Sequence, residues 1–422
     1  MPDKKSAPPL PAAIKYLFLV RLINAAGSFV MPFMTMLLTV KLGWAADRAG
    51  SFMTLMFLAG GAGMLVGGKL GDTIGRKRLI ASCQAGAAAL FAGAFATGMS
   101  PALPYLAAGA SVLLSSTWPV FNAMVADIAP PEQRKRAYSL LYWGNNIGFS
   151  LGPLAAGFLF NRATGLMFLA NAVALAIASS IIGLFVRETM PAASATTLAS
   201  ETGEEAEAEA DAKEASEKGG ILGVLGRRPL LIAFALVLAL LNLVYAQHQF
   251  SLPIFLESRL GDAGPSAFGV AMTVNGLTVV ACTALATLVT GRLPTLACMA
   301  VAGLLYAAGF GLLSFLAPGA GIALVIASTF IWTLGEILSA TNVNVFIASR
   351  SPSSHRSRLN SIVSLIAQTG SMLCPLVSGR FIAAHGSSAV WPAAACLGIC
   401  GSALMLLLFA VDRSRVKAPL RP

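Results

Sequence analysis

The feature that most restricts the fold of this chain is a series of long apolar runs separated by short polar segments. A helix needs about 20 apolar residues to cross the hydrocarbon core of a bilayer. Charged residues make up only 11% of the chain, whereas soluble proteins have about 25%. These observations predict an all-α, polytopic membrane protein with twelve transmembrane helices. The predicted spans are 14–40, 51–70, 79–99, 103–127, 137–161, 165–186, 229–256, 266–290, 294–316, 320–348, 359–382 and 389–411.

Lysine and arginine are distributed very unevenly between the two sets of loops. If the N-terminus is cytoplasmic, almost all of these residues lie in the inside segments. By the positive-inside rule, we therefore expect both termini in the cytoplasm and the protein in the cell (inner) membrane. The net charge of +11 is then explained by basic loops that lie against anionic lipid, so membrane lipids are expected partners and nucleic acid is not. The outside loops hold only Lys41, Arg48, Arg162, Arg259 and Arg380.

The two halves of the chain repeat one another at a nearly constant offset. Arg134 recurs as Arg356, and Gly148 with Pro153 recurs as Gly370 with Pro375, each at 222 positions. Such a repeat indicates two six-helix bundles related by duplication. The expected organisation is a cytoplasmic tail (1–13), an N-terminal bundle (14–187), an acidic cytoplasmic linker (188–228), a C-terminal bundle (229–411) and a second cytoplasmic tail (412–422). The linker is too acidic to enter lipid and too poor in large apolar residues to form a core.

The segment between the second and third spans is compact and strongly basic. It reads Gly68-Lys69-Leu70-Gly71-Asp72-Thr73-Ile74-Gly75-Arg76-Lys77-Arg78, and the second half keeps only a glycine and an arginine of it, at Gly291 and Arg292. Duplication alone therefore does not explain this segment. For Lys69, Lys77 and Arg78 we expect no more than a topological and lipid-contacting role.

The fifth span carries regularly spaced small residues. Gly148, Gly152, Pro153 and Gly157 predict a smooth helix face that another helix can approach closely. Pro153 removes a backbone donor and permits a bend. A gating role would add to this packing role.

Polar residues inside the spans are few. Glu336 is the one acid deep within a span; burial disfavours its charged form, so it can act as a proton carrier, or it can be a structural partner of Asn or Ser side chains. Two polar faces are predicted, one with Arg21, Asn24, Ser28 and Thr35 and one with Asn242, Tyr245 and Gln249. Such faces serve interhelical hydrogen bonds or line a cavity, Arg21 can instead extend toward the membrane surface, and His248 is a relay or a structural residue. The candidate cavity residues are Arg21, Asn24, Trp118, Asn122, Asn242, Tyr245, His248, Gln249, Trp332, Asn342 and Gln368.

Taken together, the 68–78 segment, the repeated Arg-x-Arg loops and the glycine-proline span resemble the major facilitator superfamily. The fifth-span pattern is similar to that of the drug:proton antiporter branch, although Ala156 replaces one of its paired glycines. The resemblance implies alternating access by two rocking bundles. It also implies a cytoplasmic latch made by Gly68, Asp72, Gly75 and Arg76, in which Asp72 meets the start of the eleventh helix near 357–361 and Arg76 pairs with Asp127.

These observations predict a secondary active transporter and not an enzyme. The favoured activity is proton-coupled efflux of lipophilic or weakly cationic small molecules, with protons carried by Glu336 and secondarily by Asp127; a cavity with few charges suits such substrates. The alternatives are a lipid or glycolipid flippase, a nutrient importer, and a receptor or accessory protein that no longer transports. No cofactor and no metal site is expected from the cysteine and histidine spacing, and a monomer is expected.

Overall fold

The computed structural model describes residues 9–190, 227–291, 293–319, 321–351 and 356–417. Within these residues the secondary structure is helical throughout, which confirms the all-α prediction. The chain divides into two compact units, which are described separately below. Unit 1 contains residues up to Leu42 and Leu55–Met190, and unit 2 contains Gly43–Thr54 and the residues from Pro191 onward. The predicted linker lies almost entirely outside the described residues, as do residues 1–8 of the predicted N-terminal tail.

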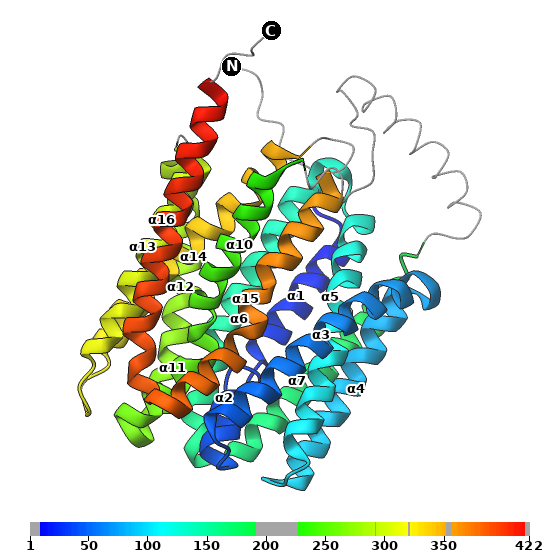
Figure 1. Cartoon of the computed structure of the whole chain (residues 1–422). Helices are drawn as coiled ribbons and strands as arrows, with labels where there is room; N and C mark the ends of the chain where they lie inside the picture. The colour runs from blue at the N-terminus through cyan, green and yellow to red at the C-terminus, as the bar shows by residue number, and fades with distance from the viewer. Residues whose placement is uncertain (1–8, 191–226, 292, 320, 352–355, 418–422) are drawn as a thin grey trace. The chain divides into compact units, whose positions relative to one another are not determined.

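Unit 1 is built from the helices of the first half (Figure 1). Within it, α4 packs against α5 and α7, and α1 packs against α6 and α7. Leu17, Leu79, Ile80, Phe121 and Ile182 belong to one buried apolar cluster that joins these helices. The elements are α1 (Ala12–Ala26), α2 (Met34–Met36), a π-helical turn (Leu37–Lys41), α3 (Ala46–Ile74, from Leu55 onward in this unit), α4 (Arg76–Thr97), α5 (Leu103–Ile128), α6 (Arg134–Arg162) and α7 (Thr164–Phe185).

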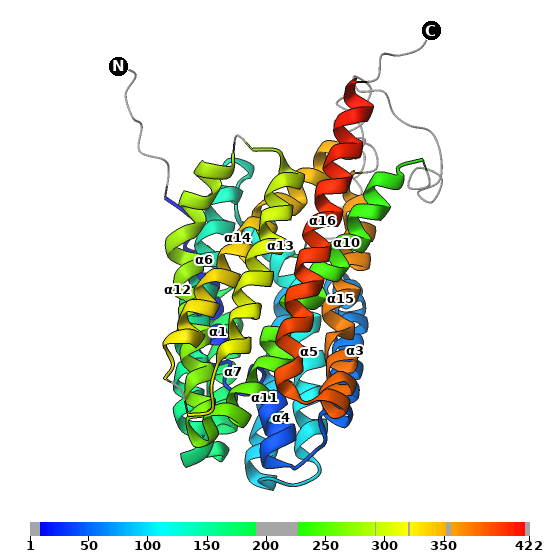
Figure 2. The same ribbon diagram turned by 60° about the vertical axis from the view of Figure 1, so that its left-hand side comes forward.

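Unit 2 contains the helices of the second half (Figure 2). α13 packs against α14 and α16, α10 packs against α15 and α16, and α12 packs against α14. Its helices are α10 (Pro229–Tyr245), α11 (Gln247–Leu260), α12 (Gly264–Thr290), α13 (Thr295–Leu312), α14 (Ala323–Arg350), α15 (Arg356–His385) and α16 (Val390–Lys417).

Each of the twelve predicted spans corresponds to one α-helix or, in the first span of each half, to two α-helices, α1 with α2 and α10 with α11. Eight stretches of the described residues are long and apolar enough to cross a membrane, and one of them covers α10, α11 and α12. α16 continues beyond the predicted end of the last span to Lys417 and so includes Asp412 of the predicted tail.

The first span of each half is broken, which the apolar pattern did not indicate. α1 ends at Ala26, where a Cβ on Gly27 would lie under 3.0 Å from Ala174. The chain then turns, and the Val30 backbone N–H donates to Asn171 Oδ1 at 3.3 Å. The predicted common face of Arg21, Asn24, Ser28 and Thr35 is therefore wrong beyond Asn24, because Ser28 and Thr35 follow the end of the helix.

The corresponding break in the second half falls at Ala246, between α10 and α11. Asn242 and Tyr245 lie on α10, whereas Gln249 lies on α11. The predicted face that joined these three residues is interrupted for the same reason. Because the two breaks occupy equivalent places in the repeat, they are a shared property of the two halves.

The glycines of the fifth and eleventh spans pack directly against the first helix of their own half. A Cβ at Gly148 would lie under 3.0 Å from Leu22 O, and a Cβ at Gly152 would lie under 3.0 Å from Ala26 O. In unit 2, a Cβ at Gly370 would collide with Ala239 O of α10. Only glycine permits this approach of two backbones. Pro153 and Gly157 are buried on the same helix as Gly148 and Gly152.

Candidate functional site

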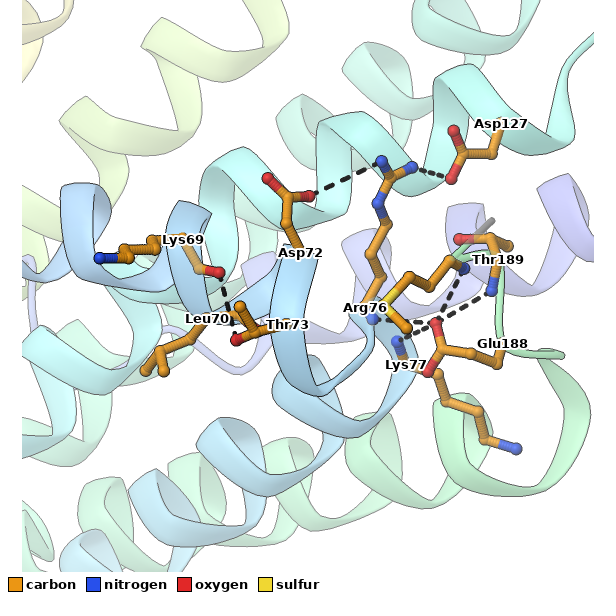
Figure 3. A network of polar contacts seen from close by, with 10 residues as sticks. Lys69, Leu70, Asp72, Thr73, Arg76, Lys77, Asp127, Glu188 and Thr189 are labelled. Atoms are coloured by element: carbon orange, nitrogen blue, oxygen red, sulfur yellow. Dashed lines mark hydrogen bonds and ion pairs between the residues drawn. The ribbon is translucent and has the colours of Figure 1, made fainter. Parts of the chain in front are cut away.

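The 68–78 segment forms the end of α3, a one-residue turn and the start of α4. Gly75 provides the turn with φ +103°, a conformation that favours glycine. The turn presents the Arg76 side chain between two carboxylates (Figure 3). Arg76 forms an ion pair with Asp127 at the end of α5, and its Nη2 atom lies 3.8 Å from Asp72 Oδ1.

Arg76 and the two carboxylates around it differ in their exposure to solvent. The Arg76 side chain is 14% exposed and that of Asp127 is 27% exposed, whereas that of Asp72 is 72% exposed. Asp127 is therefore engaged by a cation, and its secondary role as a proton carrier stays a prediction. The predicted contact of Asp72 with 357–361 stays a prediction, because it would join two units that are described separately.

Glu188 is a residue of this site that sequence reasoning missed. It follows α7, and its Oε1 atom accepts hydrogen bonds from the backbone N–H groups of Arg76 at 2.8 Å and Lys77 at 3.2 Å (Figure 3). The N–H groups of Thr189 and Met190 donate to the same oxygen at 3.0 and 3.2 Å. The carboxylate thus caps the N-terminus of α4, where a negative charge is stabilised by the helix dipole.

The ionisation of Glu188 reflects these contacts. Partial burial acts to raise the pKa of Glu188, but the four backbone N–H donors outweigh this effect and the pKa is lowered overall. The site also explains Gly75, because a Cβ there would lie under 3.0 Å from the Glu188 carboxylate. The available signal was an isolated acid at the end of an apolar run, three residues before a proline.

The glycines of α3 allow close packing against α5. A Cβ at Gly67 would collide with the backbone of Ser116, and one at Gly71 would lie under 3.0 Å from Val120. Gly68, which the sequence singled out, has more room, with Pro119 4.0 Å from the position of a Cβ. The close approach therefore depends on Gly67 and Gly71.

Arg21 is held by aromatic rings of α5. Its guanidinium carbon lies 4.2 Å from the ring centroids of both Trp118 and Phe121, a cation–π geometry. Trp118 is half exposed, so this pair lies at an accessible surface of unit 1. The Asn24 Oδ1 atom is buried without a hydrogen-bond partner in the described structure. At Asn122, the backbone oxygen accepts a hydrogen bond from the Tyr138 hydroxyl at 2.9 Å.

Glu336 is the centre of a second polar site, inside unit 2. Its Oε2 atom accepts a hydrogen bond of 2.7 Å from Asn275 Nδ2 of α12, and it also accepts one from the Tyr245 side chain. Asn275 Nδ2 lies 3.1 Å from Thr333 Oγ1, which in turn donates to Thr329 O at 2.6 Å. In the part of the chain that the structure describes, no cationic side chain pairs with Glu336.

Aromatic rings surround the Tyr245 side of this carboxylate. Tyr245 lies 5.6 Å from Tyr306 and 4.4 Å from His248, measured between ring centroids. Trp332 stacks on His248 at 5.1 Å and on Phe310 at 5.7 Å, and its ring meets that of Tyr245 edge-on at 5.9 Å. His248 Nδ1 lies 2.6 Å from Tyr245 O. Because a carbonyl oxygen only accepts, Nδ1 carries the hydrogen.

Several predicted cavity residues belong instead to the interior of unit 2. Trp332 is fully buried, and His248 and Asn342 are also buried. The rings of Trp332 and His248 stack on each other. The Asn342 amide donates to Leu338 O of its own helix at 2.9 Å. The Asn242 amide joins α10 to α15 through a 2.9 Å hydrogen bond to Ala367 O. Gln249 and Gln368 are exposed.

Sequence reasoning also missed a third polar cluster, which lies at the C-terminal end of α14. Arg350 forms an ion pair with Asp412 of α16, and Arg228 Nη1 donates to Arg350 O at 2.8 Å. Asp412 was placed in a tail because the apolar run of α16 ends before it. The Asp412 side chain is only 13% exposed. Together, Arg228, Arg350 and Asp412 connect α10, α14 and α16 within unit 2.

The comparisons with known proteins agree with this architecture. The sequence model of the Major Facilitator Superfamily matches residues 17–354 and 262–421. The Na(+), Li(+), K(+)/H(+) antiporter of Planococcus maritimus is 23% identical over 84% of this chain and 85% of its own length. The MFS-type transporter YttB of Bacillus subtilis (strain 168) is 26% identical over 90% of this chain and 91% of its own length.

Solved structures show the same fold. A POT family transporter in complex with 5-aminolevulinic acid gives a TM-score of 0.74 at 15% identity, covering 94% of this chain and 96% of the other. The nucleoside transporter NupG (D323A mutant) gives 0.76 at 13% identity, covering 94% and 99%. The family resemblance seen in the 68–78 segment and the glycine-proline helices is confirmed, and the chain belongs to the major facilitator superfamily.

Proposed function

We propose that this chain is a proton-coupled antiporter that exports lipophilic or weakly cationic small molecules, with Glu336 as its proton site. Membership of the superfamily makes it an integral membrane transporter and not an enzyme. The observation that carries the proposal is the setting of Glu336: a carboxylate inside a transmembrane helix, bonded to the neutral donors Asn275 and Tyr245. A relative whose named activity includes proton antiport supports it.

The partners of Glu336 suit a group that changes its protonation state. Asn275 donates to the carboxylate in its charged form, and Tyr245 does the same. When a proton arrives, the tyrosine hydroxyl can rotate from donor to acceptor, because one hydroxyl serves both roles. A fixed cation in place of these donors would hold the carboxylate permanently charged.

The same carboxylate can couple proton movement to a cationic substrate. A proton and a cation both neutralise Glu336, so binding of one disfavours the other, which is the exchange that antiport requires. Tyr245 and Tyr306 lie beside the carboxylate, and aromatic faces attract cations. The site therefore favours cationic or neutral lipophilic molecules over anions.

A second candidate substrate is a small inorganic cation. The Planococcus maritimus relative is named as a Na(+), Li(+), K(+)/H(+) antiporter. Glu336, Asn275, Thr333 and Tyr245 bring together oxygen atoms of the kind that bind alkali cations. The lipid flippase and the non-transporting receptor have no comparable observation in their favour.

The decisive experiment uses proteoliposomes with an imposed pH gradient. Substrate movement is recorded for the wild type, Glu336→Gln and Glu257→Gln, the last as a carboxylate at the end of α11 outside the cluster. We expect gradient-driven accumulation of an organic cation in the wild type and Glu257→Gln and its loss in Glu336→Gln, with substrate exchange at equal pH retained. Accumulation of 22Na+ or Rb+ instead would favour the inorganic candidate. Unchanged gradient-driven transport in Glu336→Gln would overturn the assignment.

We also propose that the 68–78 turn lies in the cytoplasm, together with both termini, and acts as a latch. Arg76 and Asp127 form its fixed part, and the exposed Asp72 is the group free to bind and release a helix N-terminus. Asp72→Lys should reduce transport strongly while membrane insertion stays intact, and Asp72→Asn should reduce it less. Normal transport by Asp72→Lys would contradict the latch.

A further inference from the structure

The outer surface of unit 2 contains an apolar groove that the transport proposal does not use. α12 and α13 both pack along α14 but make almost no contact with each other, although they are consecutive in sequence. Figure 2 shows α12, α14 and α13 side by side in that order. Between α12 and α13 there is therefore a groove of about 510 Å³, and α14 forms its base.

The groove has walls of hydrocarbon along its whole length. Phe330, Leu334 and Leu338, one helical turn apart, form the floor on α14. The walls come from Cys282, Leu285, Ala286, Val289 and Thr290 of α12, from Leu293 in the connection, and from Ala297, Cys298 and Val301 of α13. Among the described residues that line it, none carries a charged or amide side chain.

The groove opens on an exposed apolar surface of unit 2. Leu285, Val289, Leu293, Val301 and Phe330 are between 43 and 63% exposed. They are continuous with Leu277, Leu288 and Leu304, exposed apolar residues on the same helices. In a transmembrane bundle such a surface is covered by lipid, so the groove is a recess in an interface with hydrocarbon chains.

The dimensions of the groove suit one hydrocarbon chain. The groove extends along α12 from Cys282 to Thr290 and along α14 from Phe330 to Leu338. In each helix these two residues are eight positions apart, which is a rise of about 12 Å along the helix axis. One leaflet contributes about half of a hydrocarbon core about 30 Å thick. The groove is therefore nearly as long as the section of an acyl chain that lies within one leaflet.

We propose that this groove binds one acyl chain of a membrane phospholipid as a fixed ligand, distinct from the lipids that exchange freely around the bundle. The polar face of α14, with Thr333 and Glu336, points to Asn275, whereas Phe330, Leu334 and Leu338 occupy another face. The bound acyl chain packs between α12 and α13, which hardly contact each other directly. Its binding does not depend on the proton chemistry of Glu336.

The test maps lipid contacts directly in the intact protein. The full chain is reconstituted in phosphatidylcholine vesicles that contain a phosphatidylcholine with a diazirine in its acyl chain, irradiated, and analysed by peptide mass spectrometry. We expect the peptides of residues 282–301 to be labelled about tenfold more than lipid-facing peptides around Leu236 of α10 and Leu407 of α16, a ratio equivalent to about 1.4 kcal/mol. Equal labelling of all these surfaces would overturn the proposal, since it would indicate exchanging lipid only.

Matched variants provide an independent check. Ala286→Phe and Ala297→Phe fill the groove and should lower its labelling to the level of the other surfaces. Ala284→Phe places the same ring two residues away on an exposed face of α12 that does not line the groove, and it should leave the labelling unchanged. Unaltered labelling in both groove variants, or an equal loss in Ala284→Phe, would also overturn it. Competition of the labelling by an exported organic cation would identify a substrate in place of a lipid.

Discussion

The capping of α4 by Glu188 leads to a quantitative prediction about the stability of unit 1. Glu188 Oε1 accepts two hydrogen bonds from the first turn of α4 and two from Thr189 and Met190. Loss of a capping acceptor costs about 1 kcal/mol, and loss of a negative charge at a helix N-terminus costs about 0.3–1 kcal/mol more. Glu188→Ala should therefore destabilise the protein by about 1–2 kcal/mol.

The two effects can be separated by a second variant. Glu188→Gln keeps an acceptor oxygen but removes the charge, so we expect only the dipole contribution of about 0.3–1 kcal/mol to be lost. Both variants are compared by thermal unfolding in detergent at neutral pH. Glu132→Ala, an exposed acid in the Pro131–Gln133 turn of the same unit, is the matched control. Equal stabilities of Glu188→Ala and Glu132→Ala would refute the capping argument.

The pH dependence gives a further check on Glu188. Burial alone would raise its pKa, but the backbone donors lower it overall, so the folded-state pKa lies below the unfolded one. The stabilisation is then complete above the unfolded pKa of about 4.3 and is lost as the pH falls through the folded pKa. The stability difference between the wild type and Glu188→Gln should therefore shrink below about pH 4.5. A difference that grows on acidification would have the wrong sign.

Two further substitutions test the other contacts. Gly75→Ala forces an alanine into positive φ and against the Glu188 carboxylate, so it should cost about 1–3 kcal/mol in the same unfolding assay, and a neutral result would contradict the close contact. Asp412→Ala leaves Arg350 without its partner and should cost about 1–2 kcal/mol, between exposed and buried pairs. Combining it with Arg350→Met should recover part of the loss, and a double variant no better than Asp412→Ala would show that the ion pair is not the cause.

The helices of this protein could be predicted closely because a bilayer demands long apolar runs. The breaks at Gly27 and Ala246 could not, since each lies inside a run that is apolar enough on average to form one span, and hydropathy does not depend on backbone direction. At Gly27 the reason lies in Ala174, which packs where a side chain would stand. That residue is 147 positions away, so no local pattern contains the information.

The same reason separates predicted site residues from observed ones. Glu336 stood out because an acid within lipid is rare, and the 68–78 segment stood out because charges and glycines are dense there. The partners of these groups carried no such signal. Asn275 is one amide in an apolar helix and Glu188 is one acid at a helix end, and both become meaningful only when folding brings them to Glu336 and to the start of α4. His248 and Trp332 were expected at a cavity, but their rings stack in the interior.

By itself, the sequence determined the membrane class, the number and order of the spans, the internal duplication and the superfamily, because each depends on composition or spacing along the chain. Only the tertiary structure decided that Glu188 caps α4, that Asn275 and Tyr245 meet Glu336, and where the groove on unit 2 lies. The resemblance named Asp127 as the partner of Arg76, and the contact itself depends on how α4 packs against α5. Hydropathy encodes the transfer of a segment into lipid, whereas pairing, capping and grooves depend on distances between residues far apart in the chain.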